Sequence, residues 1–81
     1  MTPDTRLKRL YYRSCHRGCK ETDLVLGAFA DTALPGLALD MLDIYERFLD
    51  EDDANIWDWL IGKTATPGEY TGLLAMLKPN D

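Results

Sequence analysis

Residues 37–50 read LALDMLDIYERFLD, the clearest helical pattern in the chain. Its apolar side chains recur three and four positions apart, at Ala38, Met41, Leu42, Tyr45, Phe48 and Leu49. The positions between them are mostly aspartate, glutamate and arginine. Residues three and four apart share one face of an α-helix, so the stretch predicts an amphipathic helix with one buried side.

The same helical spacing continues in both directions along the chain. It predicts four further helices, over about residues 3–15, 19–30, 53–61 and 67–77. Runs of β-branched residues and strict apolar–polar alternation, which indicate strands, are absent. A chain of 81 residues is long enough for one small core. The sequence therefore predicts an all-α protein, a compact five-helix bundle with a single domain over 1–81.

Composition narrows the class of protein. The chain is 46% apolar and 28% charged, as ordinary soluble domains are. No apolar run approaches the roughly 18–20 residues that a membrane span needs. The first residues lack the apolar segment of a secretory signal. We therefore expect no membrane association and a cytoplasmic location, where Cys15 and Cys19 stay reduced.

The charge is divided unevenly along the chain. Residues 1–20 carry six basic side chains and one acidic, a net charge of +5, whereas residues 21–81 carry a net charge of −10. The basic end is therefore expected to face an acidic surface of a partner. Tyr11 and Tyr12 lie between Arg9 and Arg13, a pattern that could stack on bases beside phosphates. A small regulatory or nucleic-acid-binding protein is thus the alternative, although the acidic remainder opposes a polyanion and we expect no nucleic acid.

Catalytic and metal-binding patterns are weak. His16 is the only histidine, so a histidine-based catalytic relay would have a single member. Cys15, His16 and Cys19 could supply zinc ligands, but the second ligand pair of a zinc fingerprint is missing. The acidic residues 50–53 lack the spacing of a calcium loop, and no glycine-rich phosphate loop occurs. We therefore expect that the protein is not an enzyme and that it has no catalytic, metal-binding or cofactor-binding residues.

The most unusual local feature is the segment 17–21, Arg-Gly-Cys-Lys-Glu. Gly18 permits a sharp turn between two helices. Arg17 offers a rigid fork of donors, and Glu21, one helical turn further on, offers acceptors. The two side chains either present opposite charges to a partner or pair with each other. The residues alone leave both readings open.

Two segments resemble a known family. Residues 9–30 read RLYYRSCHRGCKETDLVLGAFA, and residues 52–60 read DDANIWDWL. Both are similar to the FAD assembly factors of succinate dehydrogenase, the family of SdhE and succinate dehydrogenase assembly factor 2. The RGxxE motif of that family falls on Arg17, Gly18 and Glu21.

The resemblance implies a function as well as a fold. It implies a small helical chaperone that binds the flavoprotein subunit of succinate dehydrogenase, and in some bacteria fumarate reductase, and promotes its covalent FAD attachment. The FAD is then attached to the partner, and this chain needs no cofactor of its own. By the same resemblance Arg17, Gly18 and Glu21 are expected to contact the partner, with Arg13 and His16 as neighbours. The free protein is expected to be a monomer.

Overall fold

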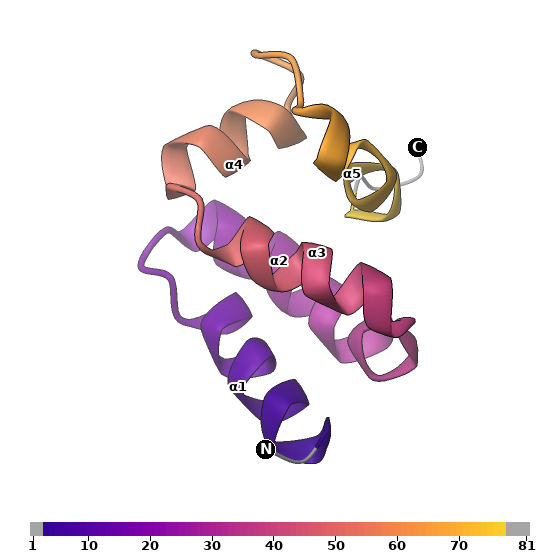
Figure 1. Ribbon diagram of the computed structural model, residues 1–81. Coiled ribbons are helices and arrows are strands. Elements are labelled where there is room, and N and C mark those ends of the chain that lie inside the picture. The colour runs from indigo at the N-terminus through magenta and orange to yellow at the C-terminus, as the bar shows by residue number, and fades with distance from the viewer. Residues whose placement is uncertain (1–2, 78–81) are drawn as a thin grey trace.

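The structure, a computed structural model, describes residues 3–77 (Figure 1). Its five α-helices are α1 (Pro3–Cys15), α2 (Lys20–Thr32), α3 (Leu39–Leu49), α4 (Asp53–Leu60) and α5 (Thr71–Leu77). Short 3₁₀ turns at Leu34–Gly36 and Gly68–Tyr70 precede α3 and α5. No strand occurs within residues 3–77, and the predicted all-α, five-helix fold is confirmed. The ends of the domain expected over 1–81, residues 1–2 and 78–81, lie outside the described part.

The helices enclose one core. In Figure 1, α1, α2 and α3 lie together, and α4 and α5 lie across the other side of the α2–α3 pair. Every helix contributes at least one buried apolar side chain to this core. From the predicted stripe of α3, Leu42, Tyr45, Phe48 and Leu49 are buried.

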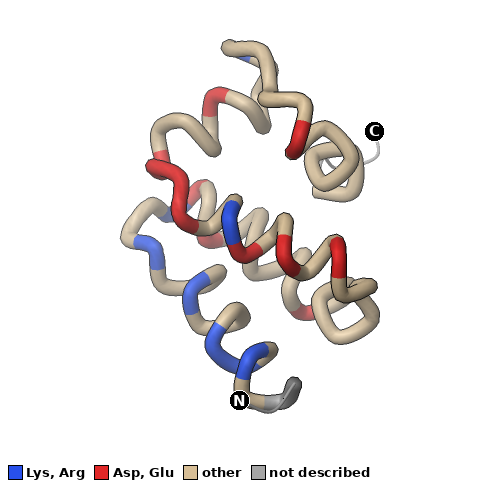
Figure 2. Tube along the Cα trace, in the orientation of Figure 1, with Lys and Arg blue, Asp and Glu red and all other residues tan. Residues whose placement is uncertain are grey.

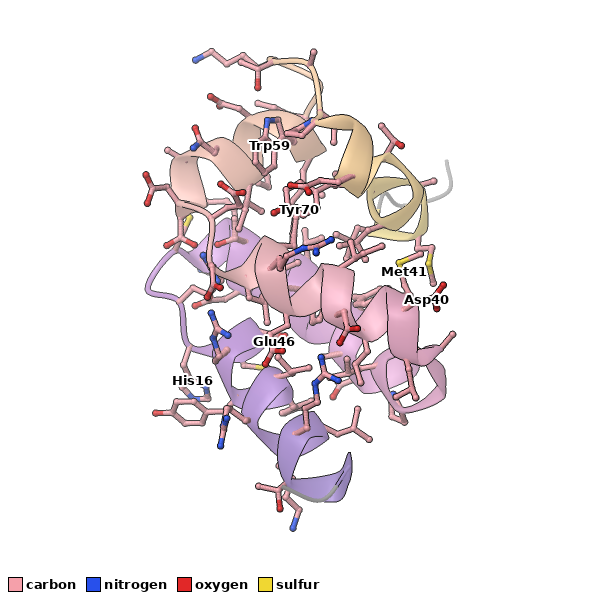
Figure 3. The ribbon with its side chains drawn as sticks, in the orientation of Figure 1. His16, Asp40, Met41, Glu46, Trp59 and Tyr70 are labelled. Atoms are coloured by element: carbon pink, nitrogen blue, oxygen red, sulfur yellow. The ribbon has the colours of Figure 1, made fainter. Side chains whose placement is uncertain are left out.

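Aromatic rings form the centre of this core. The Phe48 ring lies 5.2 Å from the Tyr70 ring, in an edge-to-face arrangement, and 6.0 Å from the Trp59 ring. Tyr45 continues the cluster from Phe48 to Phe29 on α2. Figure 3 shows the Trp59 and Tyr70 side chains between the upper helices and α3. Ring pairs in these geometries add to the stabilisation from burial alone, so the cluster joins both halves of the bundle.

The observed helix bounds differ from the expected ones at some ends. The helix expected over 37–50 begins at Leu39, because Leu37 and Ala38 are extended, with ψ of 139° and 153°. The helix expected over 19–30 continues to Thr32, whose hydroxyl donates to the carbonyl oxygen of Ala28 at 3.0 Å. Such differences of a few residues arise where turns compete with the helix for the same backbone groups.

A buried polar pair joins α1 to α3. The Tyr45 hydroxyl lies 2.5 Å from the Ser14 hydroxyl, and both residues have no exposed surface. Ser14 donates in turn to the carbonyl oxygen of Leu10 at 2.7 Å, so Tyr45 is the donor to Ser14. Burial raises the pKa of Tyr45 to about 12, which keeps the phenol neutral and able to donate. The two hydroxyls therefore satisfy each other in the core.

This pair predicts an asymmetric response to mutation. Ser14→Ala leaves the Tyr45 hydroxyl buried without a partner and is expected to lower the unfolding free energy by about 1–3 kcal/mol. Tyr45→Phe leaves Ser14 bonded to Leu10 and is expected to have a smaller effect. Urea unfolding of both variants and of the double variant measures this. The double variant should be more stable than Ser14→Ala alone, and a double variant that loses the sum of both effects would contradict the prediction.

Candidate functional site

The connection between α1 and α2 is a tight elbow, residues 16–19. Gly18 has a φ of +94°, in the left-handed region that side chains with a Cβ rarely adopt. A Cβ built at Gly18 meets nothing within 4 Å, so the space beside it is open to solvent. The backbone N–H of Arg17 donates to the Asp23 carboxylate at 3.0 Å, which fixes the elbow to the first turn of α2. The turn predicted at this glycine is therefore present and exposed.

Arg17 faces into the molecule. Its guanidinium donates to the Asp53 carboxylate and, at 2.6 Å each, to the carbonyl oxygens of Leu49 and Glu51. The side chain is only 11% exposed. The last carbonyls of a helix have no partner within it, and α3 ends at Leu49 while α4 begins at Asp53. Arg17 therefore holds the corner between α3 and α4 and fixes the elbow to it.

Glu21 lies on the first turn of α2 and is exposed. Its own backbone N–H and the Cys19 thiol, 3.4 Å away, donate to the carboxylate and lower its pKa. Both donors favour the ionised form. The internal Arg17–Glu21 pair, one of the two readings left open by the sequence, is not formed, because Arg17 is paired with Asp53. The elbow thus presents a negative charge next to an open glycine.

Arg13 and His16 lie on the α1 side of the elbow. The His16 ring is stacked on Tyr12, with centroids 4.2 Å apart, and Figure 3 shows His16 at the outer edge of α1. Its Nδ1 lies 3.0 Å from the Tyr12 carbonyl oxygen, which can only accept, so Nδ1 is the protonated nitrogen. Arg13 pairs with Asp50 at 2.5 Å. These side chains and Arg17 line a hollow of about 270 Å³.

Three of the six basic side chains in residues 1–20 form ion pairs within the chain. Arg6 pairs with Asp43 at 2.6 Å and with Glu46 at 3.0 Å, while Arg13 and Arg17 pair with acids at the end of α3 and the start of α4. Figure 2 shows the basic residues of α1 lying alongside the acidic residues of α3. An acidic partner surface was expected for the basic end, but three of its arginines find acidic partners within the chain itself.

Sequence reasoning missed the residues that hold the elbow. The sequence pattern singled out Asp53 only as one of the acidic residues 50–53, and it singled out no contact for Asp23. The Asp53 carboxylate accepts a hydrogen bond from the Arg17 side chain, and the Asp23 carboxylate accepts one from the Arg17 backbone N–H. No local spacing indicates the Asp53 contact, since the two residues are 36 positions apart. The Asp23 contact spans six positions and is made by the Arg17 backbone, so no helical spacing indicates it either.

Three other features follow from the described residues. Within residues 3–77, no group of three or more histidine, cysteine, aspartate or glutamate side chains is arranged to hold a metal ion. In the same range, none of the helices has the length and apolar character that crossing a bilayer requires. Cys15 and Cys19 are free thiols.

These observations describe a small helical protein with an exposed, internally held elbow. Residues 8–80 match the family model described as flavinator of succinate dehydrogenase, and the chain belongs to that family. The resemblance seen in the sequence is thereby confirmed.

Several curated relatives carry the name succinate dehydrogenase assembly factor 2, mitochondrial. The relative from Aspergillus terreus is 41% identical over 70 residues, which cover 83% of this chain and 24% of the relative. The relative from Schizosaccharomyces pombe is 38% identical over 69 residues, covering 85% of this chain and 50% of the relative. The chain thus spans between a quarter and a half of the length of these two relatives. No solved structure matches it at a comparable level.

The relatives correct one expectation. A cytoplasmic location was expected because the first residues lack a secretory signal. The relatives are named as mitochondrial proteins, which points to a mitochondrial location and contradicts the cytoplasmic one. The reasoning failed because the absence of a secretory signal excludes only one route out of the cytoplasm.

Proposed function

We propose that this protein binds the flavoprotein subunit of succinate dehydrogenase and promotes the covalent attachment of FAD to that subunit. A fumarate reductase flavoprotein is a second client of the same kind. The family, described as flavinators of succinate dehydrogenase, and the names of the relatives support this proposal. According to this proposal the chain is not an enzyme. The flavin chemistry takes place on the client, and the docked protein holds the client in a productive arrangement.

One observation carries the proposal more than any other. Gly18 and Glu21, two of the three motif residues, are exposed at an elbow whose conformation is held by bonds from the third, Arg17. A surface fixed before contact loses little conformational entropy on binding, as a docking surface requires. Gly18 leaves room for a partner backbone to approach, and Glu21 offers it a carboxylate. We assign Gly18 and Glu21 as contacts, His16 and Arg13 as neighbours, and Arg17 as the residue that positions them.

The charges around two hollows of the surface support the proposal that the client itself holds the FAD. A bound FAD needs cations or backbone N–H groups for its diphosphate. In the hollow beside the elbow, both arginines are already paired with carboxylates, Arg13 with Asp50 and Arg17 with Asp53. The larger groove between α2 and α5 has no cation in its lining. The residues that line these two hollows therefore offer the FAD diphosphate no unpaired cation, and we propose that the client holds the FAD.

The nucleic-acid alternative receives less support. Phosphate binding requires unpaired lysine and arginine side chains on one surface. Arg6, Arg13 and Arg17 are all paired with acids on α3, directly after it, or at the start of α4. The remaining charge of the first 20 residues rests mainly on Lys8, Arg9 and Lys20. No specific observation favours this function over docking to a protein.

The test substitutes the two exposed motif residues. Gly18→Asn adds a side chain that tolerates the left-handed conformation, and Glu21→Gln removes the charge while keeping the shape. In cells that lack the wild-type gene, both variants are expected to reduce the in-gel fluorescence of covalent flavin in the flavoprotein subunit. Their helical circular dichroism should match that of wild type, because both sites are exposed.

Gly62 offers a matched control. It too has a positive φ, +78°, and open space beside it, but it lies at the far end of α4. Gly62→Asn should carry the same backbone strain and leave flavin attachment unchanged. If deletion of the whole gene leaves the flavin fluorescence at its wild-type level, the proposed function is wrong.

A further inference from the structure

A second exposed surface begins one helical turn beyond the elbow. α2 and α5 enclose an apolar groove of about 510 Å³ whose lining includes Leu24, Ala28, Phe29, Met76 and Leu77. Leu24 is 66% exposed and Met76 is 47% exposed. The lining carries no charged side chain. Neither the RGxxE motif nor the packing of the core accounts for these exposed apolar side chains, and such patches mark binding sites.

The groove continues the surface of the elbow. Glu21, Leu24 and Ala28 are three and four positions apart on α2, so they follow one another along a single face of the helix. All three are exposed. A partner that contacts Glu21 therefore meets the apolar groove within one further turn of α2. Contact at the elbow and contact in the groove are parts of one continuous surface.

Charge defines the partner more closely. Glu21 is ionised, since its pKa is lowered by donors at the start of α2. The salt bridges within the described residues join Arg6, Arg13 and Arg17 to acids between Asp43 and Asp53, and none includes Glu21. Its neighbour Lys20 acts on it only through space. A lysine or arginine of a partner would complement this carboxylate at the end of the groove.

The backbone limits how that partner can bind. Residues 3–77 contain no strand, so no sheet edge is present there to which a partner could add a strand. The groove lies between two α-helices, whose backbone N–H and C=O groups form hydrogen bonds within each helix. An apolar groove between helices instead accepts the apolar face of an amphipathic helix, with anchors at positions i, i+3 or i+4, and i+7.

We propose that the groove of α2 and α5 binds an amphipathic helix of the client flavoprotein, whose apolar side chains lie over Leu24, Ala28 and Met76. That helix carries a lysine or arginine at the end that meets Glu21. This inference rests on the proposed function and names the part of the client that the surface recognises. The elbow fixes the orientation of the complex, and the groove supplies its apolar burial.

The experiment measures the affinity of the full chain for the purified flavoprotein subunit by calorimetry. Leu24→Gln and Met76→Gln remove apolar surface without adding charge, and each is expected to weaken binding about tenfold, as loss of a central anchor does. Ala28→Trp fills the groove and should weaken binding without removing apolar surface. Leu39, 73% exposed on α3 and outside the groove, provides the matched control, and Leu39→Gln should bind within about twofold of wild type.

The outcomes separate the groove from the proposed function. Groove variants that bind like wild type, while Glu21→Gln binds weakly, would overturn the groove proposal and leave the proposed function intact. A wild-type chain that does not bind the flavoprotein would overturn both. If Leu24→Gln abolishes a dimer of the free chain in sedimentation, the groove binds a second copy and the proposal is wrong. If it abolishes the fluorescence quenching of added free FAD, the groove binds FAD and the proposal is equally wrong. Exchange of Glu21 for lysine, rescued by a glutamate at the basic position of the client helix, would support it.

Discussion

Replacing Phe48 with alanine is expected to lower the unfolding free energy by about 3–5 kcal/mol. Phe48 has no exposed surface, and its ring contacts those of Tyr45, Trp59 and Tyr70. The substitution removes buried apolar area, leaves a cavity and separates rings from three different elements of the fold. A domain of this size is typically stable by only about 4–12 kcal/mol. The variant should therefore be largely unfolded in moderate urea.

Urea unfolding followed by circular dichroism measures this loss. Phe48→Leu keeps an apolar side chain in the same place and is expected to cost less than half as much. Leu39→Ala, at an exposed position on the same helix, should change the stability by no more than about 0.5 kcal/mol. A loss below 1 kcal/mol for Phe48→Ala would show that the aromatic cluster does not hold the two halves of the bundle together.

The part of the fold that depends on local periodicity could be predicted from the sequence. The helix face of Leu42, Tyr45, Phe48 and Leu49 is buried as their spacing indicates, because a 3.6-residue period places them together whatever else the chain does. Ala38 matches the same spacing but is exposed and extended, because it precedes the first turn of α3. Periodicity identifies a face, but it does not determine where the helix begins.

The candidate site shows which contacts helical periodicity does not predict. The sequence identified the elbow, because glycine between two helical patterns has a local meaning. It could not identify the acceptors of Arg17, which lie 32 to 36 positions away at the junction of α3 and α4. Spacing rules reach about four residues along a helix, so they suggested Glu21 instead. The charge division likewise suggested a partner, whereas the folded chain brings its own acids to Arg6 and Arg13.

Replacing Arg17 with alanine is expected to have the largest effect of any substitution at the elbow. It removes donors to three acceptors at once: the Asp53 carboxylate and the carbonyl oxygens of Leu49 and Glu51. Removing one partner of a fully buried ion pair costs about 3–5 kcal/mol. Because Asp53 remains 31% exposed and regains some water, we expect a loss of about 2–3 kcal/mol.

Two further variants identify the cause of the stability loss expected for Arg17→Ala. Arg17→Lys keeps the charge, but a single ammonium group cannot reproduce the fork that reaches three acceptors, so it should recover only part of the stability. Arg13→Ala breaks a comparable but more exposed pair, with Arg13 32% and Asp50 70% exposed, and should cost about 0–1 kcal/mol. The two arginines are close in sequence, so the contrast between them isolates burial and the number of acceptors.

The same variants separate positioning from contact. If Arg17 acts by holding Gly18 and Glu21 in place, Asp53→Asn, which alters only the internal side of the pair, should weaken binding of the flavoprotein as Arg17→Lys does. Asp53 is one of the acceptors of Arg17, on the first turn of α4, so a direct contact of Arg17 with the client would not require it. Unfolding in urea and calorimetric affinity, measured on both variants, distinguish the two roles. An Asp53→Asn variant with reduced stability and full affinity would show that Arg17 meets the client itself.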